Sequence, residues 1–480
     1  MHQSPVNDMP ITRNHLRYIS VPFFLALMTP CVSAQEKGYV SGGVESNSAL
    51  YSNSAFHSNN YLKLDYVRGR FSAGLQAEYY PNPLLGYDLS LKGVGLPGKY
   101  MAWTDETFGI TVGDFYDQFG TGIIFRSWED RDLGWNNSLG GGRVSFRSGD
   151  GVFSAKALGG FARKGLWYGS NALSGAEASL QLGGLQLGGS TVVRFGEGAP
   201  SWAWSAVSAF ERGGFSARAE WVGKQGGNAQ TLELSFAKER FSSALTLRRL
   251  QNMLDPAGLN YLPSLCLEQS YALASLNPYT TFAAGELGGS IDLFYRLKTS
   301  WKFHLNGSYI FALPSALKRH DVLRMTYRDL NAKVEKRWGR QWETVAFVSI
   351  QEQSPSHGER KATDAQNAFV LDVVYKTGKK LSVRTQLQYL YSQELTRDWM
   401  AASAGISSTS GWSFHVQDMY NHGSSKVHYY EVGAGWTRGA FKADLAFGHQ
   451  RAGLVCSGGV CRWQPEYRGC ILRLSYQIAR

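Results

Sequence analysis

The sequence predicts an all-β protein: a large transmembrane antiparallel β-barrel of roughly 18 to 24 strands without a plug domain. Three observations predict this fold. Apolar and polar residues alternate with a period of two from about Tyr39 to the carboxyl end. Short turns alternate with long polar or irregular connections. The longest apolar stretch lies near the amino terminus, so no later segment is expected to cross a membrane as a helix.

The amino-terminal segment is typical of an export signal. Two arginines precede the apolar run Tyr18–Met28, which is too short for a stable membrane anchor. The small residues Val32-Ser33-Ala34 then fit the rule for signal-peptide cleavage. We expect a signal peptide over residues 1–34, cleaved after Ala34, and an outer-membrane barrel over residues 35–480. This location makes nucleic acid an improbable partner.

Strand-like runs carry apolar residues on one face and charged residues on the other. In Phe215–Val222, for example, Arg218 and Glu220 alternate with alanine and tryptophan. Runs of about nine to eleven residues are long enough for a tilted strand to cross a membrane. If the apolar faces meet lipid, the opposite faces line the lumen. The predicted lumen-lining residues are Lys63, Asp65, Arg218, Glu220, Asp292, Arg296, Arg384, Lys442 and Asp444.

The connections also favour a membrane barrel. Short turns such as Arg68–Arg70 and Thr437–Ala440 contrast with the long connections at 254–281, 354–365 and 451–468. Outer-membrane barrels place short turns on the periplasmic side and long loops outside. A secreted β-sandwich array or propeller is the soluble alternative, but the alternation continues without a linker. The early first strand leaves no room for a plug domain.

Composition and charge narrow the function. Charged residues make up 18% of the chain, below the roughly 25% of soluble domains. Removal of the signal peptide takes away two basic residues and one acid, so the formal net charge of +11 becomes +10. Positive charge favours anionic solutes, lipopolysaccharide or acidic glycans. Basic residues that only decorate the rims and loops would produce the same net charge.

The sequence contains no convincing enzyme signature. It has no GxSxG, HExxH or P-loop motif, and its glycine clusters do not open helices. We therefore predict that the protein is not an enzyme and has neither a metal site nor a cofactor.

The cysteines predict one disulfide. Cys456 and Cys461 flank a short glycine-containing segment without nearby histidines, which favours a disulfide at a hairpin tip over a zinc site. Cys266 and Cys470 either pair or stay reduced, and the sequence does not decide between these alternatives.

The segment Gly113–Phe146 departs from the regular alternation. Its two ends resemble strands, but the link between them is crowded with charged residues and with Phe125, Trp128 and Trp135. Charges facing lipid would cost several kcal/mol each, so these side chains are expected to face water or each other. An inward-folded loop would narrow the pore with opposed charges. An exposed loop with solvated ion pairs is the alternative. The predicted constriction consists of Arg126, Glu129, Asp130, Arg131, Asp132 and Arg143.

In this constriction, we expect the two arginines of the link to pair with its three acids. The three aromatic side chains would then anchor the loop against the barrel wall.

This segment resembles the hallmark of an uncharacterised family of outer-membrane barrels from Bacteroidota, FGxGxxxRxxEERxLGxDNxxxGxRV. Asp130 stands where that pattern has its second glutamate, and Trp135-Asn136 departs from its xD pair. It is less closely similar to alginate-export porins, whose glycine turn and Asp/Arg-rich link line a polar pore. Neither resemblance implies a substrate. The matching residues are Phe119, Gly120, Gly122, Arg126, Glu129, Arg131, Leu133, Gly134, Asn137 and Arg143.

These features predict a porin-like channel that passes small or anionic solutes through a polar lumen narrowed by a charged inward loop. Outer-membrane lipid and lipopolysaccharide would surround it, and other envelope proteins are candidate partners. The alternative is a non-conducting barrel subunit of a secretion or surface-assembly complex. The rather apolar connection Asp255–Thr280 suits docking in such a complex.

Overall fold

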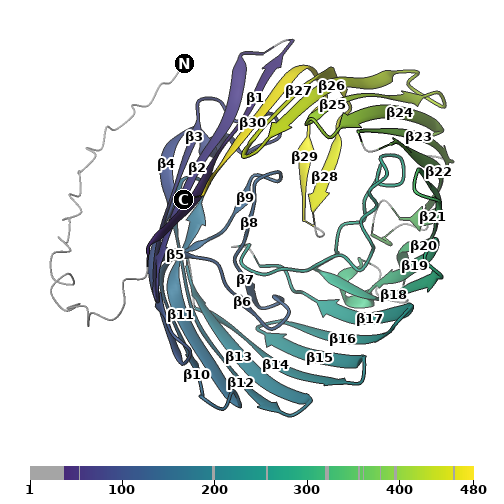
Figure 1. Ribbon diagram of the computed structural model, residues 1–480. Helices are drawn as coiled ribbons and strands as arrows, with labels where there is room; N and C mark the ends of the chain where they lie inside the picture. Colours follow the sequence, from purple (N-terminus) through teal and green to yellow (C-terminus); the bar gives the residue numbers. More distant parts are fainter. Residues whose placement is uncertain are drawn as a thin grey trace, which may run out of the picture. The chain divides into compact units, whose positions relative to one another are not determined.

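The computed structural model describes residues 37–479 except 53, 197–199, 256–257, 319–323, 355–356, 360–361, 379, 394–396 and 458–459. The predicted signal peptide and its cleavage after Ala34 lie outside the described residues. Residues 38–480 form one compact unit, in which 24 strands close into a ring (Figure 1).

The strands of the ring follow chain order, and each is antiparallel to its neighbours. They are β1 (Tyr39–Tyr51), β2 (Phe56–Arg68), β3 (Phe71–Tyr80), β4 (Gly93–Thr104), β5 (Phe108–Phe115), β10 (Leu139–Arg147), β11 (Phe153–Lys164), β12 (Trp167–Leu182), β13 (Leu185–Phe195), β14 (Ser201–Arg212), β15 (Phe215–Lys224), β16 (Gly227–Lys238), β17 (Phe241–Gln251), β18 (Gly285–Leu297), β19 (Trp301–Ala312), β20 (Arg324–Trp338), β21 (Trp342–Gln353), β22 (Asp364–Thr377), β23 (Leu381–Ser392), β24 (Trp399–Ser408), β25 (Trp412–Asn421), β26 (His428–Arg438), β27 (Phe441–Gln450) and β30 (Tyr467–Ala479).

The first and last strands close the barrel. β1 pairs with β30 from Ser41↔Ala479 to Tyr51↔Gly469, which joins the two ends of the sheet into a ring. The fold class is therefore confirmed, and the 24 strands lie at the upper end of the predicted range. Among the described residues, helix is limited to the short 3-10 turns η1 (Leu89–Leu91) and η2 (Pro314–Ala316), and none is long enough to cross a membrane.

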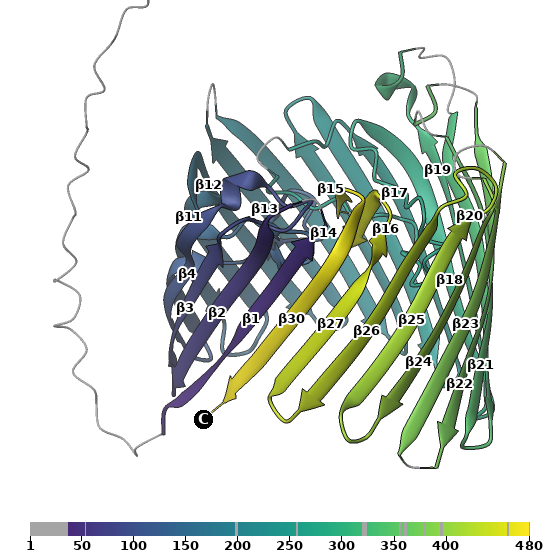
Figure 2. The same ribbon diagram turned by 90° about the horizontal axis from the view of Figure 1, so that it is seen from above.

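The connections differ between the two ends of the barrel, as Figure 2 shows. One end, the turn end, has tight hairpins in which glycines such as Gly69, Gly183 and Gly439 adopt positive φ angles. This conformation suits two-residue turns, because their twist matches that of the paired strands. The other end, the loop end, carries the longer connections, among them 81–92 and 252–284.

The outer face of the wall is apolar. Trp221, Leu387 and Leu445 point outward and are 59%, 54% and 52% exposed. They alternate with polar or charged residues that point to the lumen, so the predicted period of two places lipid-facing side chains correctly. Aromatic pairs such as Trp301–Trp338 and Trp412–Trp436 lie near the turn end, where an interfacial girdle is expected.

Three segments fold into the ring (Figure 1). The first inward loop (116–138) contains β6 (Gln118–Phe119), β7 (Phe125–Arg126), β8 (Glu129–Asp130) and β9 (Trp135–Asn136). The described part of the second inward loop (252–284) contains no strand. The third inward loop (451–466) is the hairpin of β28 (Gly453–Ser457) and β29 (Val460–Gln464).

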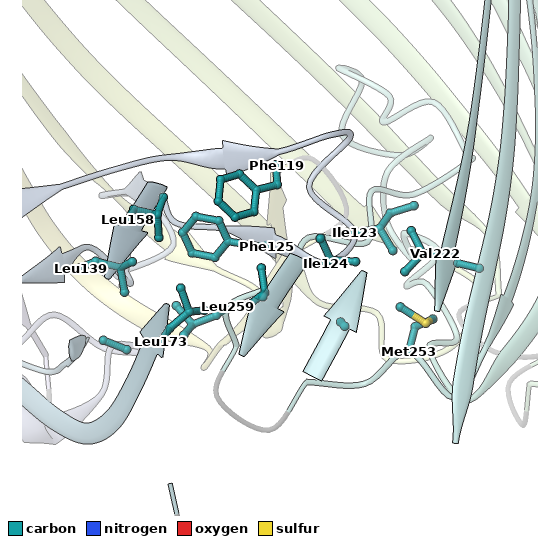
Figure 3. Close-up of a cluster of buried hydrophobic side chains, with 14 of the residues drawn as sticks. Phe119, Ile123, Ile124, Phe125, Leu139, Leu158, Leu173, Val222, Met253 and Leu259 are labelled. Carbon is teal, nitrogen blue, oxygen red and sulfur yellow. The ribbon is translucent and has the colours of Figure 1, made fainter. Parts of the chain in front are cut away.

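The largest apolar core therefore lies inside the barrel, between the first inward loop and the wall (Figure 3). Phe119 and Phe125 are fully buried, and they pack in one cluster with Leu158, Leu173 and other wall residues of β11–β17. Burial of each such side chain contributes about 2 kcal/mol. The first inward loop is thus bound to one side of the wall by a hydrophobic contact.

Candidate functional site

The tip of the first inward loop is fixed by backbone hydrogen bonds to acids of the wall. The N–H of Gly120 donates to Glu177 of β12 at 2.8 Å, and the N–H of Thr121 donates to Glu220 of β15 at 2.9 Å. Gly120 has a φ of 53°, and a Cβ there would lie 2.2 Å from a carboxylate oxygen of Glu220. Glycine is therefore required for the close approach between loop and wall.

Asp117 anchors the start of the same loop. Its carboxylate lies 2.8 Å from Nζ of Lys156 and 3.2 Å from a guanidinium nitrogen of Arg143. Lys156 also donates to the carbonyl of Gln118 and lies 3.0 Å from Glu177. Arg143 therefore belongs to the wall of the site, as a partner of an acid that the sequence interpretation missed. Asp117, the second acid of GDFYDQFG, was the available signal.

Arg131 fixes the far part of the loop. Its guanidinium lies 2.7 Å from Glu45 of β1, 3.4 Å from Glu129 and 4.6 Å from the centre of the Tyr61 ring on β2. Glu129 also accepts from Gln76 of β3 at 2.8 Å. The structure thus joins Arg131 to Glu129, as expected, and adds a wall acid that lies 86 residues away in the sequence.

Arg126 takes a different partner from the expected acids. Its guanidinium carbon lies 4.0 Å from the ring centre of Tyr261 in the second inward loop and 5.3 Å from that of Trp128. Asp130 accepts from the N–H of Leu133, and the backbone carbonyl of Asp132 accepts from Arg462. No ion pair among the described residues joins Arg126 to an acid of the link, so this part of the expected pairing is wrong.

The aromatic side chains of the loop pack in two different places. Phe125 is fully buried against the wall. Trp128 instead lies 6.3 Å from Trp135 and 5.9 Å from Tyr261, between ring centres. Trp128 and Trp135 therefore help to hold the two inward loops together.

The first and second inward loops are joined by main-chain hydrogen bonds. The N–H of Arg126 donates to the carbonyl of Leu259, and the N–H of Tyr261 donates to the carbonyl of Gly122, both at 2.9 Å. Asn137 donates to the carbonyl of Gly258 at 2.8 Å. The two loops therefore act as one partition inside the barrel.

The second inward loop is bound to the opposite wall. Tyr271, Leu273 and Leu276 pack in a cluster with Phe347, Leu390 and other residues of β21–β24. On β17 and β18, Arg248 and Glu286 form a buried ion pair at 2.5 Å, and Arg248 also donates to the loop carbonyl of Pro263. Sequence reasoning treated this connection as an external docking surface and did not anticipate its inward course.

The third inward loop contains the predicted disulfide, since the structure joins Cys456 to Cys461. The two glycines at its tip lie outside the described residues. Arg462 of this hairpin lies 4.6 Å from the ring centre of Tyr87. Cys266 and Cys470 are unpaired in the structure. Burial raises the pKa of the Cys266 thiol well above its ordinary value.

The other predicted lumen residues lie on the inner face and have local partners, except Arg218, whose Nε is buried without a hydrogen-bond partner in the described part of the chain. Lys63 lies 3.6 Å from Asp65, Lys442 lies 3.1 Å from Asp444, and Arg384 lies 2.5 Å from Asp372. Asp292 meets His304 at 2.6 Å, Glu220 binds the loop tip, and Arg218 and Arg296 lie towards the turn end. Among the described residues, no group of histidines, cysteines and acids is arranged to hold a metal ion.

Residues 16–478 of the sequence match a family of unknown function, DUF6029. The chain belongs to DUF6029. No curated protein matches this DUF6029 sequence. The Bacteroidota origin implied by the sequence resemblance stays a prediction.

Solved structures share the barrel fold of this DUF6029 protein. The P pilus tip assembly intermediate PapC-PapD-PapK-PapG from E. coli matches with 11% identity and a TM-score of 0.52, over 94% of this chain and 62% of that chain. The P pilus usher PapC translocation pore has 12% identity and a TM-score of 0.48, with 92% and 99% covered. A BenF-like porin from Pseudomonas fluorescens has 12% identity and a TM-score of 0.37, with 92% and 98% covered. The likeness places this DUF6029 chain among large outer-membrane-type barrels by fold.

Proposed function

We propose that the protein is an outer-membrane channel for small solutes, with a preference for anions, and that the first inward loop forms its constriction. The observation that carries this proposal is the fixation of the loop on two sides. Arg131 binds Glu45 of β1, whereas Asp117 binds Arg143 of β10 and Lys156 of β11. A loop held in this way gives a lumen a defined width and a defined set of charges.

The wall towards the turn end supports passage of polar solutes. Its inner face carries partly exposed ion pairs, of which Lys63–Asp65 and Lys442–Asp444 have lysine side chains more than half exposed. Such a surface replaces part of the hydration shell of a solute and does not favour apolar cargo.

The proposed anion preference rests on Arg126. Its charge faces aromatic rings rather than a carboxylate among the contacts described here. In a narrow, low-dielectric passage, a cation that no nearby carboxylate neutralises attracts anions. The positive net charge of the chain acts in the same direction.

Single-channel recording tests this proposal. The mature protein, beginning at Gln35 if cleavage follows Ala34, is inserted into a planar bilayer beside Arg126→Ala and Arg131→Ala, with Arg340→Ala in an exposed turn as the control. We expect discrete openings with an anion-selective reversal potential, which weakens in Arg126→Ala and is unchanged in Arg340→Ala. A cation-selective wild type would refute the anion preference.

A second function is favoured by the packing of the second inward loop. Its contacts with β21–β24 and with the first inward loop fill part of the lumen with buried side chains. A non-conducting subunit of an envelope complex would have this construction. A folded wild type that stays silent in the bilayer, and that co-purifies with the same envelope protein in independent preparations, would favour this second function over the channel.

A further inference from the structure

One place in the barrel wall lacks a complete β-ladder. β4 and β5 pair over five residues, from Tyr100↔Gly113 to Thr104↔Gly109, whereas every other neighbouring pair of described ring strands shares at least eight. β5 ends at Phe115, where the chain turns inward as the first inward loop. Residues 93–99 of β4 therefore have no strand beside them on that side. We call this stretch of wall the β4 window.

A turn and several side chains close the β4 window. Leu166, in the turn between β11 and β12, fits against Gly95, where a Cβ would lie 3.0 Å from it. The N–H of Lys99 donates to Asp114 at 2.9 Å, and Nζ of Lys99 lies 3.3 Å from the carbonyl of Leu96. Pro97, which lacks an N–H, suits such an edge. Side-chain contacts thus replace the ladder that closes the rest of the ring.

A polar pocket of about 330 Å³ lies on the inner side of the same turn, since Arg163, Lys164 and Gly165 belong to its lining. Its lining has four carboxylate side chains, three basic side chains and three asparagines, together with Tyr61, Tyr80 and Trp135. The nitrogen of the Trp135 indole is buried and has no hydrogen-bond partner among the described residues.

This lining fits a carbohydrate better than a phosphate. The acids outnumber the bases, so the pocket offers no excess positive charge to an anion. Hydroxyl groups, by contrast, pair with carboxylates, guanidinium groups and amides alike, and aromatic faces pack against the apolar side of a sugar ring.

The outer side of the β4 window is apolar. Val94 and Leu96 of β4 are 63% and 49% exposed, and Trp167, directly after Leu166, is 70% exposed. Phe161 of β11 is 51% exposed on the same part of the wall. Acyl chains pack on such side chains, and an indole suits the boundary between lipid and headgroups. Figure 2 shows β4, β11 and β12 together at this side of the barrel.

We propose that the β4 window is a binding site for a membrane glycolipid with an uncharged sugar headgroup. The headgroup occupies the pocket behind the β11–β12 turn, and the acyl chains lie outside on Val94, Leu96 and Trp167. The Leu166 contact with Gly95 is the part of the wall that separates to admit the headgroup. The pocket shares Glu129, Asp130 and Arg131 with the proposed constriction, so the test measures lipid retention and not conductance.

Native mass spectrometry of the full mature chain tests the proposal. The barrel is placed in phosphatidylethanolamine nanodiscs that contain either a glucosyl diacylglycerol or phosphatidylglycerol with the same acyl chains. We expect the glucolipid to be retained about tenfold more strongly, a difference of about 1.4 kcal/mol. Trp135→Leu on the inner side and Trp167→Ala on the outer side should each remove most of this retention.

Controls separate specific binding from misfolding. Trp412→Ala removes an outer-face tryptophan that is 50% exposed and far from the β4 window in the sheet order, and it should leave retention unchanged. Because Trp135→Leu alters the inward loop, Asn171→Leu, which changes the pocket from β12, provides a second test. Heat-modifiable gel mobility reports folding of each variant. Equal retention of the two lipids, or stronger retention of phosphatidylglycerol, would overturn the proposal.

Discussion

Arg163 and Glu78 form an ion pair at 2.6 Å that joins β11 to β3, although β4, β5 and β10 lie between these strands in the sheet. Their side chains are 2% and 1% exposed. Glu78 also accepts from Gln76 and Tyr80. The pair can form because neither β5, which ends at Phe115, nor β10, which begins at Leu139, extends to the loop end. The end of β11 therefore reaches β3 on the inner side of the barrel.

Removal of one partner of this pair should be costly. We expect Arg163→Ala to lower the free energy of unfolding by about 3–5 kcal/mol, because it leaves Glu78 buried and uncompensated. The double variant Glu78→Leu with Arg163→Met should be much less destabilised, since no buried charge remains. Urea unfolding followed by tryptophan fluorescence measures both. Wild-type stability of Arg163→Ala would contradict the burial of the pair.

The approach of Gly120 to Glu220 gives a second prediction. Gly120→Ala should release the tip of the first inward loop and raise the single-channel conductance, because its Cβ would overlap the carboxylate. Gly183→Ala is the matched control, since Gly183 also has a positive φ, of 61°, but would place its Cβ in open space. The control should lose only about 1 kcal/mol of stability and conduct as the wild type does. Equal conductance of the two variants would show that the tip does not set the width.

The Cys266 thiol should resist alkylation. Burial raises its pKa, so a smaller fraction is thiolate at a given pH, and the thiolate is the reactive form. We expect iodoacetamide to react with Cys266 in the folded barrel at least about tenfold more slowly than in urea at the same pH. Mass spectrometry of the labelled peptide measures the rates. Equal rates would show that the second inward loop is undocked in solution.

His357 should make docking of the loop-end connections depend on pH. Its ring stacks on Phe282 at 4.8 Å, and burial lowers its pKa below the ordinary value, although Glu286 and Glu359 act in the opposite direction. The unfolded state therefore binds its proton first as pH falls. The contribution of neutral His357 to the free energy of unfolding is fully present above about pH 6.5. It declines as the pH falls from there towards the lower pKa of the folded state.

A variant isolates this contribution. His357→Phe keeps an aromatic ring on Phe282 but cannot be protonated. As the pH falls from about 7.5 to about 5, we expect the wild type to lose unfolding free energy relative to His357→Phe. The loss should begin near the ordinary histidine pKa of about 6.5. A difference that is independent of pH would show that His357 titrates equally in both states.

Local sequence patterns predicted the wall of the barrel well. The alternation around Arg218 and Glu220 assigned Trp221 to the opposite, outer face, where it is 59% exposed, because side-chain direction in a strand follows directly from residue parity. The charges around Arg131 indicated an inward loop because a charged segment is too costly in lipid.

Such local patterns could not predict contacts between residues that lie far apart in the sequence. Glu45 meets Arg131 only because β1 and the first inward loop are brought together by closure of the ring. The inward course of the second loop depends on complementary apolar residues such as Phe347 and Leu390 on distant strands. Its apolar residues predicted burial, but they did not specify whether the covering surface belonged to this chain or to a partner.

The β1–β30 pairing constrains how the protein is made. Ser41 pairs with Ala479, so the seam that closes the ring joins two strands that lie far apart in the sequence. Without β30, the other strands of the ring leave two edges of unpaired backbone, which lipid does not tolerate. Unassisted insertion of the strands one after another is therefore disfavoured. The strands have to be kept from aggregating until β1 and β30 meet.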